Sequence, residues 1–372
     1  MNRRTLFVLV AIVLTAATVA RSGHELPVYP SYYPHEIEIR SVTPDEAARL
    51  LADGKMQAFI GSLPQFAGDP PRTVRTVASL GSFIIVRVNS ASRWAGSNAA
   101  ACAAVQTVIR DLATKRVDVI VHPYPVTPFH GDFLQHADRA DAAWNRFLMG
   151  APDAGAPAIS ELKVKAIGAL APKLFHADLY TEGADWDVAV EDVSAADLAF
   201  RATVSSNGWL GPSWFKTGWF QASLLFGAPT DLQRLKDAAY ENTVERLNLE
   251  RSMVAELIAG CRAVVAGYTV QREYFNTEFT GGIENIAYDS IEGLSSPMFV
   301  RTVKLRDFPW NGWLTLGVDG PAAAAWNPIA GFTDRFGRLV WYALGDPALI
   351  PSPGSADWIL NRITDVEPKP KR

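Results

Sequence analysis

Strand-like and helix-like segments alternate along the first third of this chain, and this alternation constrains the fold more than any other feature. A predicted helix begins at Asn98, where apolar residues recur at three- and four-residue steps. Strands are predicted on both sides of it, at residues 83–88 and 117–121, from short apolar runs. This order predicts an α/β layered fold with mixed, partly parallel sheets.

The clearest local signal in the chain is the start of a helix at Thr43. Its hydroxyl can cap the helix, Pro44 suits the first helical position, and Glu46 completes a capping box. Gly54 can end the helix in a left-handed conformation, and residues 56–60 then form an apolar strand. A strand–helix–strand unit is therefore predicted here.

The rest of the chain predicts a second lobe with a long helix. A capping box at Thr230 and Gln233 begins this helix, which is predicted to reach about Gly267 with an interruption near Asn242. Further strands are predicted at residues 162–167, 268–275, 299–305 and 313–318.

The predicted two-lobed organisation depends on a stretch rich in glycine, proline and alanine, which is typical of a linker. The segments are a first α/β lobe at 21–149, a linker at 150–158, a second α/β lobe at 159–365 with a tryptophan-rich C-terminal region, and a tail at 366–372.

Residues 1–20 have the parts of a secretory signal. Arg3 and Arg4 precede an uncharged run that ends in small residues. Cleavage after Ala20 is the preferred interpretation, and an uncleaved anchor is the alternative. Either one predicts a periplasmic or otherwise extracytoplasmic protein.

The net charge of the chain narrows the classes of partner. A formal net charge of −4 and the lack of a basic stripe argue against nucleic-acid binding.

Cys102 and Cys261 both fall on apolar helix faces, which favours two buried free thiols. A disulfide stays open as the alternative, because sequence cannot show whether two Cα atoms are close.

The loop at residues 118–138 is the first candidate site, because it follows a predicted strand, and open α/β sheets bind ligands where strands end. His122, His130, Asp132 and His136 are residue types that bind zinc and similar metals. Their spacing matches no known zinc pattern. Histidines bonded within a proline-rich loop are the structural alternative.

Two other regions are candidates on composition. Seven carboxylates between Asp178 and Asp197 could bind calcium, with a solvated acidic face as the alternative. Aromatic residues gather in groups that suit a core, an interface or a ligand pocket. They are Tyr29, Tyr32, Tyr33, Trp209, Trp214, Trp219, Phe220, Trp310, Trp313, Trp326 and Trp341.

Several catalytic motifs are absent from the sequence. It contains no G-x-S-x-G elbow, no phosphate-binding loop and no dinucleotide-binding glycine fingerprint. A non-enzymatic role is favoured, although enzymatic activity stays open.

The segment EIRSVTPDEAARLLADGKMQAFIG, residues 38–61, resembles the two-lobed periplasmic solute-binding proteins of ABC transporters. The resemblance covers residues 25–121. It implies a small-molecule ligand between two lobes, contacted by Tyr32, Tyr33, Ser62 and His122, and an inner-membrane transporter as partner. The long helix after Thr230 and the tryptophan-rich C-terminal region depart from the family.

Three functions are therefore weighed. The first is an exported small-molecule-binding protein associated with transport. The second is an accessory subunit of a membrane-bound complex that docks through its aromatic C-terminal half. The third is a metal-dependent enzyme using His122, His130 and Asp132, for which a divalent metal would be the cofactor.

Overall fold

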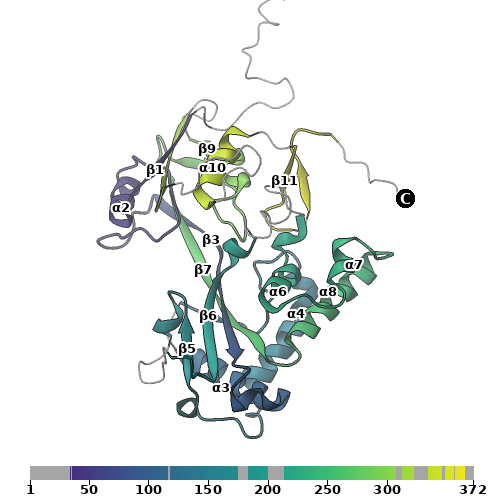
Figure 1. Ribbon diagram of the computed structural model, residues 1–372. Coiled ribbons are helices and arrows are strands. Elements are labelled where there is room, and N and C mark those ends of the chain that lie inside the picture. The colour runs from purple at the N-terminus through teal and green to yellow at the C-terminus, as the bar shows by residue number, and fades with distance from the viewer. Residues whose placement is uncertain are drawn as a thin grey trace, which may run out of the picture.

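The computed structural model describes residues 34, 36–115, 118–174, 183–199, 213–306, 312–321, 334–345, 348–355 and 357–364. Its centre is an eight-stranded sheet (Figure 1). In spatial order the main strands are β1 (Glu36–Ser41), β10 (Trp313–Val318), β2 (Ala58–Ile60), β7 (Ala263–Asn276), β3 (Val74–Val88), β6 (Val188–Ser194) and β5 (Val164–Ile167). The eighth strand, β4 (Ile120–Val121), pairs with β7.

The sheet is mixed, as the sequence predicted. β10 pairs in parallel with both β1 and β2, and β5 pairs in parallel with β6. The long strand β7 is antiparallel to β2, β3 and β4, and β3 is antiparallel to β6. The α/β class with partly parallel sheets is therefore confirmed.

Two lobes lie at opposite ends of the paired strands β3 and β7 (Figure 1). The small lobe has its core around β1, β2 and β10, while the large lobe packs helices around β4, β5, β6 and the other end of β3. Val77 of β3 packs into the small-lobe core, and Phe83 of the same strand packs into the large-lobe core.

A bulge marks the passage of β3 from one lobe to the other. The register of β3 against β7 shifts between Leu80 and Phe83. The backbone N–H of Ser82 donates to the hydroxyl of Thr269, 2.8 Å away. A Cβ atom at Gly81 would lie 2.4 Å from that hydroxyl, so the close approach of the strands requires glycine here.

The helices are divided between the lobes. The small lobe contains α2 (Pro44–Ala52), α9 (Pro297–Thr302) and α10 (Arg335–Leu344). The large lobe contains α3 (Asn98–Thr114), α4 (Phe133–Trp144), α6 (Gly218–Phe226), α7 (Leu232–Lys236) and α8 (Thr243–Ile258). Among the described residues, every helix is too short or too polar to cross a bilayer.

Short elements complete the described chain. The 3₁₀ turns are η1 (Arg93–Gly96), η3 (Ile159–Glu161), η4 (Ala171–Lys173) and η6 (Ser213–Lys216), and η2 (Asn145–Met149) is a π turn. Two small antiparallel sheets pair β8 (Ile283–Asn285) with β9 (Lys304–Leu305), and β11 (Leu349–Pro351) with β12 (Trp358–Leu360).

Local signals placed several elements correctly. The Thr43 hydroxyl accepts the backbone N–H of Glu46 at 3.3 Å, as a capping residue should, and Gly54 follows the helix with φ of +68°. The helix predicted from Asn98 begins there, and the strand predicted at 313–318 is β10.

Two predicted elements were wrong. Residues 297–302 form a helix rather than a strand, because Pro297 occupies its first turn and only Lys304 and Leu305 pair as strand. In the second, the predicted interruption near Asn242 is confirmed, since it separates α7 from α8 and Asn242 caps α8, but the predicted end of the helix is wrong. It does not reach Gly267, because the chain turns at Cys261 and continues as β7 from Ala263.

The cysteines form a disulfide, which overturns the expectation of free thiols. Cys102 on α3 is bonded to Cys261 in the turn between α8 and β7, with their Cα atoms 4.9 Å apart. The two residues are 159 positions apart in sequence, so only the fold brings them together.

The sequence predicted two lobes formed by consecutive halves of the chain, but each lobe of the structure combines segments that are far apart in the chain. β10 lies between β1 and β2 in the small lobe, while β5 and β6 extend the large-lobe end of β3. The predicted linker at 150–158 packs on α3, where Gln106 accepts the N–H of Asp153 and Thr107 donates to the carbonyl of Pro157. The predicted signal at 1–20 and tail at 366–372 lie outside the described residues.

Candidate functional site: the interlobe cavity

The histidine loop is folded into the large lobe, where the rings of His130 and His136 are both buried. The Nδ1 atom of His130 accepts the backbone N–H of Thr127 at 2.9 Å, and Nε2 donates to the side-chain oxygen of Gln221 at 3.0 Å. The ring stacks on Phe83 with centroids 6.0 Å apart. Burial lowers the pKa of His130, so the ring is neutral at pH 7.

His136 and Asp132 are close but are not arranged as metal ligands. The Nδ1 atom of His136 lies 2.9 Å from the hydroxyl of Tyr124, and its Nε2 is 4.0 Å from the Asp132 carboxylate. Asp132 accepts the backbone N–H groups of Gly218 and Trp219, at 2.9 and 3.1 Å, in the first turn of α6. Its oxygens therefore fix the start of that helix.

His122 lies apart from this pair. Its Nε2 donates to the carbonyl of Val126 at 2.9 Å, and its ring contacts the rings of Phe133 and Tyr268. Among the described residues, no group of three or more His, Cys, Asp or Glu side chains could hold a metal ion. The geometry gives no support to a metal centre in this loop.

Three carboxylates of the acidic stretch are bonded to neighbouring groups of the large lobe. Asp187 accepts from Ser92, Glu191 pairs with Arg87 at 3.1 Å, and Asp192 accepts two backbone N–H groups at 3.1 Å. Asp178 and Glu182 lie outside the described residues.

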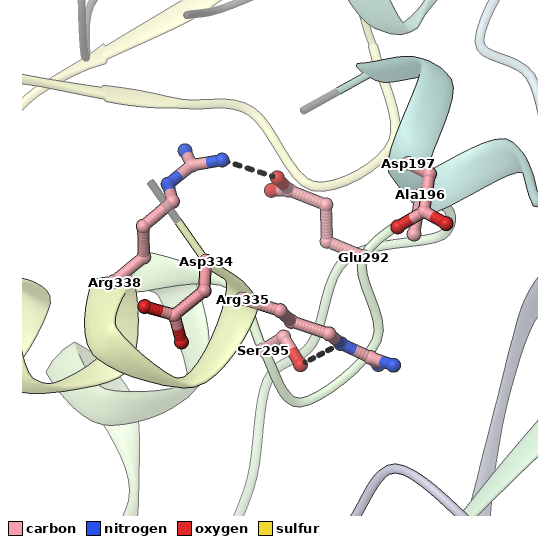
Figure 2. Close-up of a pocket in the computed structure, with 7 residues that line it drawn as sticks. All are labelled: Ala196, Asp197, Glu292, Ser295, Asp334, Arg335 and Arg338. Carbon is pink, nitrogen blue, oxygen red and sulfur yellow. Dashed lines mark hydrogen bonds and ion pairs between the residues drawn. The ribbon is translucent and has the colours of Figure 1, made fainter. Parts of the chain in front are cut away.

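At the boundary between the lobes, charged side chains line a hollow (Figure 2). A cavity of about 270 Å³ lies between α10 of the small lobe, the loop after β8, and the helical residues 195–199 that follow β6 of the large lobe. It is lined by Ala196, Asp197, Glu292, Ser295, Asp334, Arg335 and Arg338. A second hollow, next to the bulge of β3, shares Asp197 with it.

Glu292 connects cations from both lobes at the edge of this cavity. One carboxylate oxygen lies 3.2 Å from the Nζ of Lys216, which precedes α6, and the other lies 3.7 Å from a guanidinium nitrogen of Arg338 on α10. Burial alone would raise the pKa of Glu292, but these two cations lower it below its ordinary value. Glu292 is therefore charged and electrostatically joins the two lobes.

Lys216 is almost fully buried and has a second anionic partner in Asp289. Burial opposes the charge of the ammonium, but Asp289 and Glu292 raise the pKa of Lys216. Burial raises the pKa of Asp289 against the effect of Lys216. The loop that contains both carboxylates is attached to β3, because Leu80 donates its N–H to the carbonyl of Ser290 at 2.8 Å.

Arg335 is held at the cavity by a buried carboxylate from β7. Its guanidinium donates to Glu273 at 2.8 Å and to the hydroxyl of Ser295 at 2.6 Å. Burial raises the pKa of Glu273, and Arg335 opposes that shift. Asp334 caps α10 by accepting the N–H of Gly337 at 2.8 Å, which places a carboxylate beside the two arginines.

This arrangement suits a ligand that has both charges. Three carboxylates and two guanidinium groups line the cavity, and the large lobe contributes Asp197 while the small lobe contributes Asp334, Arg335 and Arg338. These charged groups can bind a solute through ion pairs and charge-assisted hydrogen bonds.

Neither His122 nor Ser62, the described residues among those predicted to bind a ligand, lines the interlobe cavity. Tyr32 and Tyr33 lie outside the described residues. Ser62 follows Gly61, which donates its backbone N–H to Glu273, the partner of Arg335. The Ser62 hydroxyl is buried with no hydrogen-bond partner within the described part of the chain.

The aromatic groups are divided between core and surface. Trp219 and Phe220 are buried in the large-lobe core with Trp214 packed against them. Trp313 is 72% exposed at the start of β10. Trp209, Trp310 and Trp326 lie outside the described residues.

The sequence reasoning missed Glu292, Arg335 and Arg338. Their segments contain no known motif, and the carboxylate is 43 residues from the first arginine in the chain. The available signal was the spacing of the two arginines, which puts both on one face of a helix that otherwise carries aromatic and aliphatic residues.

Comparisons with known proteins give distant structural matches and no sequence match. No family model matches the sequence, and no characterised protein matches it by sequence. Among solved structures, the ABC transporter-associated periplasmic binding protein DppA from Helicobacter pylori in complex with peptide STSA matches at 12% identity and a TM-score of 0.37, over 71% of this chain and 55% of that one.

Two further structures have similar scores. The oligopeptide-binding protein AppA from Bacillus subtilis, in complex with a nonapeptide, shares 11% identity over 68% of this chain and 57% of its own, with a TM-score of 0.36. The nickel ABC transporter from Bacillus halodurans shares 10% identity over 66% and 57%, with a TM-score of 0.37. The chain thus spans little more than half the length of these structures. Their descriptions agree with the predicted resemblance, and scores this low carry no argument about a ligand or partner.

Proposed function

We propose that this chain is a binding protein that holds a small zwitterionic solute between its two lobes. The observation that carries the proposal is the interlobe cavity, in which a carboxylate of the large lobe faces the carboxylates and guanidinium groups of the small lobe. A ligand with one cationic and one anionic group could pair with Asp197 of the large lobe at one end and with Arg335 or Arg338 of the small lobe at the other.

The strands that connect the two lobes support a closing motion. The described segments that run from lobe to lobe include β3 and β7, and β3 contains the bulge at Gly81 where they cross. Bulges bend strands, and a bend here would open or close the cavity without disturbing either core.

Export is part of the proposal. The pattern of residues 1–20 is typical of a secretory signal, and the Cys102–Cys261 disulfide suits an oxidising compartment. Delivery of the bound solute to a transporter in the inner membrane is the role that the resemblance of residues 38–61 implies.

The test is ligand-dependent stabilisation of the purified protein by a panel of amino acids, short peptides, betaines and polyamines. A ligand at 100 times its Kd should stabilise the fold by about 2.7 kcal/mol, which raises Tm measurably. Asp197→Asn should weaken binding about tenfold, because it removes a lining charge without breaking an ion pair that holds the lobes. Asp45→Asn on α2 is the matched control, since Asp45 is exposed and lies away from the cavity.

Scattering measurements supply the second readout. Binding should reduce the radius of gyration if the lobes close on the solute. A panel that leaves Tm unchanged, or a bound solute whose affinity is the same in Asp197→Asn, would remove the interlobe cavity as the site.

A further inference from the structure

A separate groove lies inside the large lobe, apart from the interlobe cavity and from the hollow next to the bulge of β3. Its volume is about 230 Å³, and it lies between α8 on one side and α4 with the π turn η2 on the other. Its floor is formed by Tyr124, Phe147 and Val264, which are buried. No residue lines both this groove and the interlobe cavity.

The walls of the groove are apolar and its rim is cationic. Phe147, Ile258 and Val264 supply the larger apolar surfaces. The only charged residues that line it are Arg139 and Arg146, and both are exposed to solvent. A groove with this composition favours a ligand that has an apolar body and a negative charge at one end.

The π turn gives one wall of the groove its shape. It directly follows α4, and side chains of α3 bind the carbonyls that it presents. Gln106 donates to the carbonyl of Arg146, and Arg110 donates to that of Phe147, each at 2.9 Å. π turns are rare, and they occur frequently at functional sites, so a π turn held in this way is a specific feature of the wall.

The same turn positions the second rim arginine. The guanidinium of Arg146 lies over the ring of Phe147, 5.2 Å from its centroid, and one of its nitrogens lies 2.9 Å from the Sγ of Cys102. It is therefore oriented beside the apolar floor. On α4, the carboxylate of Asp138 is bound by Arg251 at two distances of 2.7 Å, so it is already paired next to Arg139.

We propose that this groove is a second binding site, which takes a short-chain aliphatic or single-ring aromatic carboxylate. The carboxylate would pair with Arg139 and Arg146, and the apolar body would lie over Phe147, Ile258 and Val264. Pockets for drug-sized ligands have volumes of about 300–1,000 Å³, and the groove is smaller than these. A short acid therefore fits it better than a long lipid chain.

The test is titration of the full-length protein with hexanoate and benzoate, with hexanol and benzyl alcohol as uncharged counterparts. Isothermal calorimetry and amide chemical shifts give the affinities and the location. Hexanoate should bind at least fivefold tighter than hexanol, because only the acid can pair with the rim guanidinium groups.

The variants separate this site from the interlobe cavity. Arg139→Gln should weaken hexanoate by about twofold to fivefold and leave hexanol unchanged, and the double variant with Arg146→Gln should remove the preference for the acid. Arg49→Gln on α2 is the matched control, and Asp197→Asn should not change hexanoate binding. Because Arg146 also contacts the disulfide, Arg139→Gln alone decides the matter if the double variant does not fold.

Three results would overturn the proposal. They are equal affinities for hexanoate and hexanol, an unchanged hexanoate affinity in Arg139→Gln, and no binding of either acid at millimolar concentration. None of them bears on the zwitterion site, whose test uses other ligands and Asp197→Asn.

Discussion

The histidine loop and the interlobe cavity both contain titratable side chains, but those of the loop face the protein core and those of the cavity face a hollow. In the loop, His130, His136 and Asp132 direct their polar atoms at neighbours in the large-lobe core. At the cavity, Arg335, Arg338 and Glu292 are paired and still line a hollow. Residue type alone therefore does not locate a site. What matters is whether the fold leaves space beside the polar groups.

The largest expected effect is on the free energy of unfolding, and it tests whether the junction of the lobes depends on the Lys216 ammonium. Lys216→Met keeps the length of the side chain but leaves Asp289 buried without this counter-ion, and leaves Glu292 with Arg338 alone. Breaking a buried pair on one side costs about 3–5 kcal/mol, so the free energy of unfolding in urea should fall by that amount.

The matched control for this variant is Lys163→Met. Lys163 pairs with Asp185 at the surface, with both side chains more than half exposed. Its loss should cost less than about 0.5 kcal/mol. If Lys216→Met were equally mild, the junction would not depend on that ion pair.

The second effect concerns Glu250, a buried acid on α8 near Asp132. Burial raises the pKa of Glu250 to about 7, although Arg246 is 3.0 Å away. The folded state then binds a proton between about pH 4.5 and 7 that the unfolded chain releases. Stability contributed by the protonated acid is therefore present at the lower pH and lost as the pH rises to 7.

The measurement is the difference in unfolding free energy between the wild type and Glu250→Gln, taken from pH 4.5 to 7.5. The wild type should lose about 3 kcal/mol relative to the variant across that window. His130 and His136 have pKa values lowered by burial, so their contributions have the opposite slope below pH 6.5. Those contributions cancel in the difference, and a flat difference would contradict a raised pKa at Glu250.

The smallest effect asks whether the histidine loop takes part in binding. His130→Phe keeps a ring against Phe83 but leaves the N–H of Thr127 and the oxygen of Gln221 without their partner. Leaving such groups unpaired costs about 1–3 kcal/mol. Solute affinity should be unchanged in calorimetry, whereas Asp197→Asn should reduce it. The reverse pattern would move the site back to the loop.

The parts of the fold that sequence predicted are those fixed by neighbours in the chain. The start of α2 follows from Thr43 and Pro44, and β10 follows from a short alternating run that pairs with β1 in the structure. The mixed α/β class follows from the sum of such signals.

The parts that sequence missed depend on contacts between distant segments. Val264 and Val265 suit either a helix face or a strand, and pairing with β3 makes them strand. β6 was hidden by its carboxylates, since Glu191 is paired with Arg87 across the sheet. The interlobe cavity could not be predicted, because its arginines and Glu292 meet only after both lobes have formed.

The position of β10 has a consequence for the order of folding. This strand comes from residues 313–318 and lies between two strands from residues 36–41 and 58–60. About 250 residues must therefore be synthesised and collapse nearby before the first two strands gain a shared neighbour. Until then their edges are open to wrong pairing, so a chaperone that delays early collapse should raise the yield of native protein.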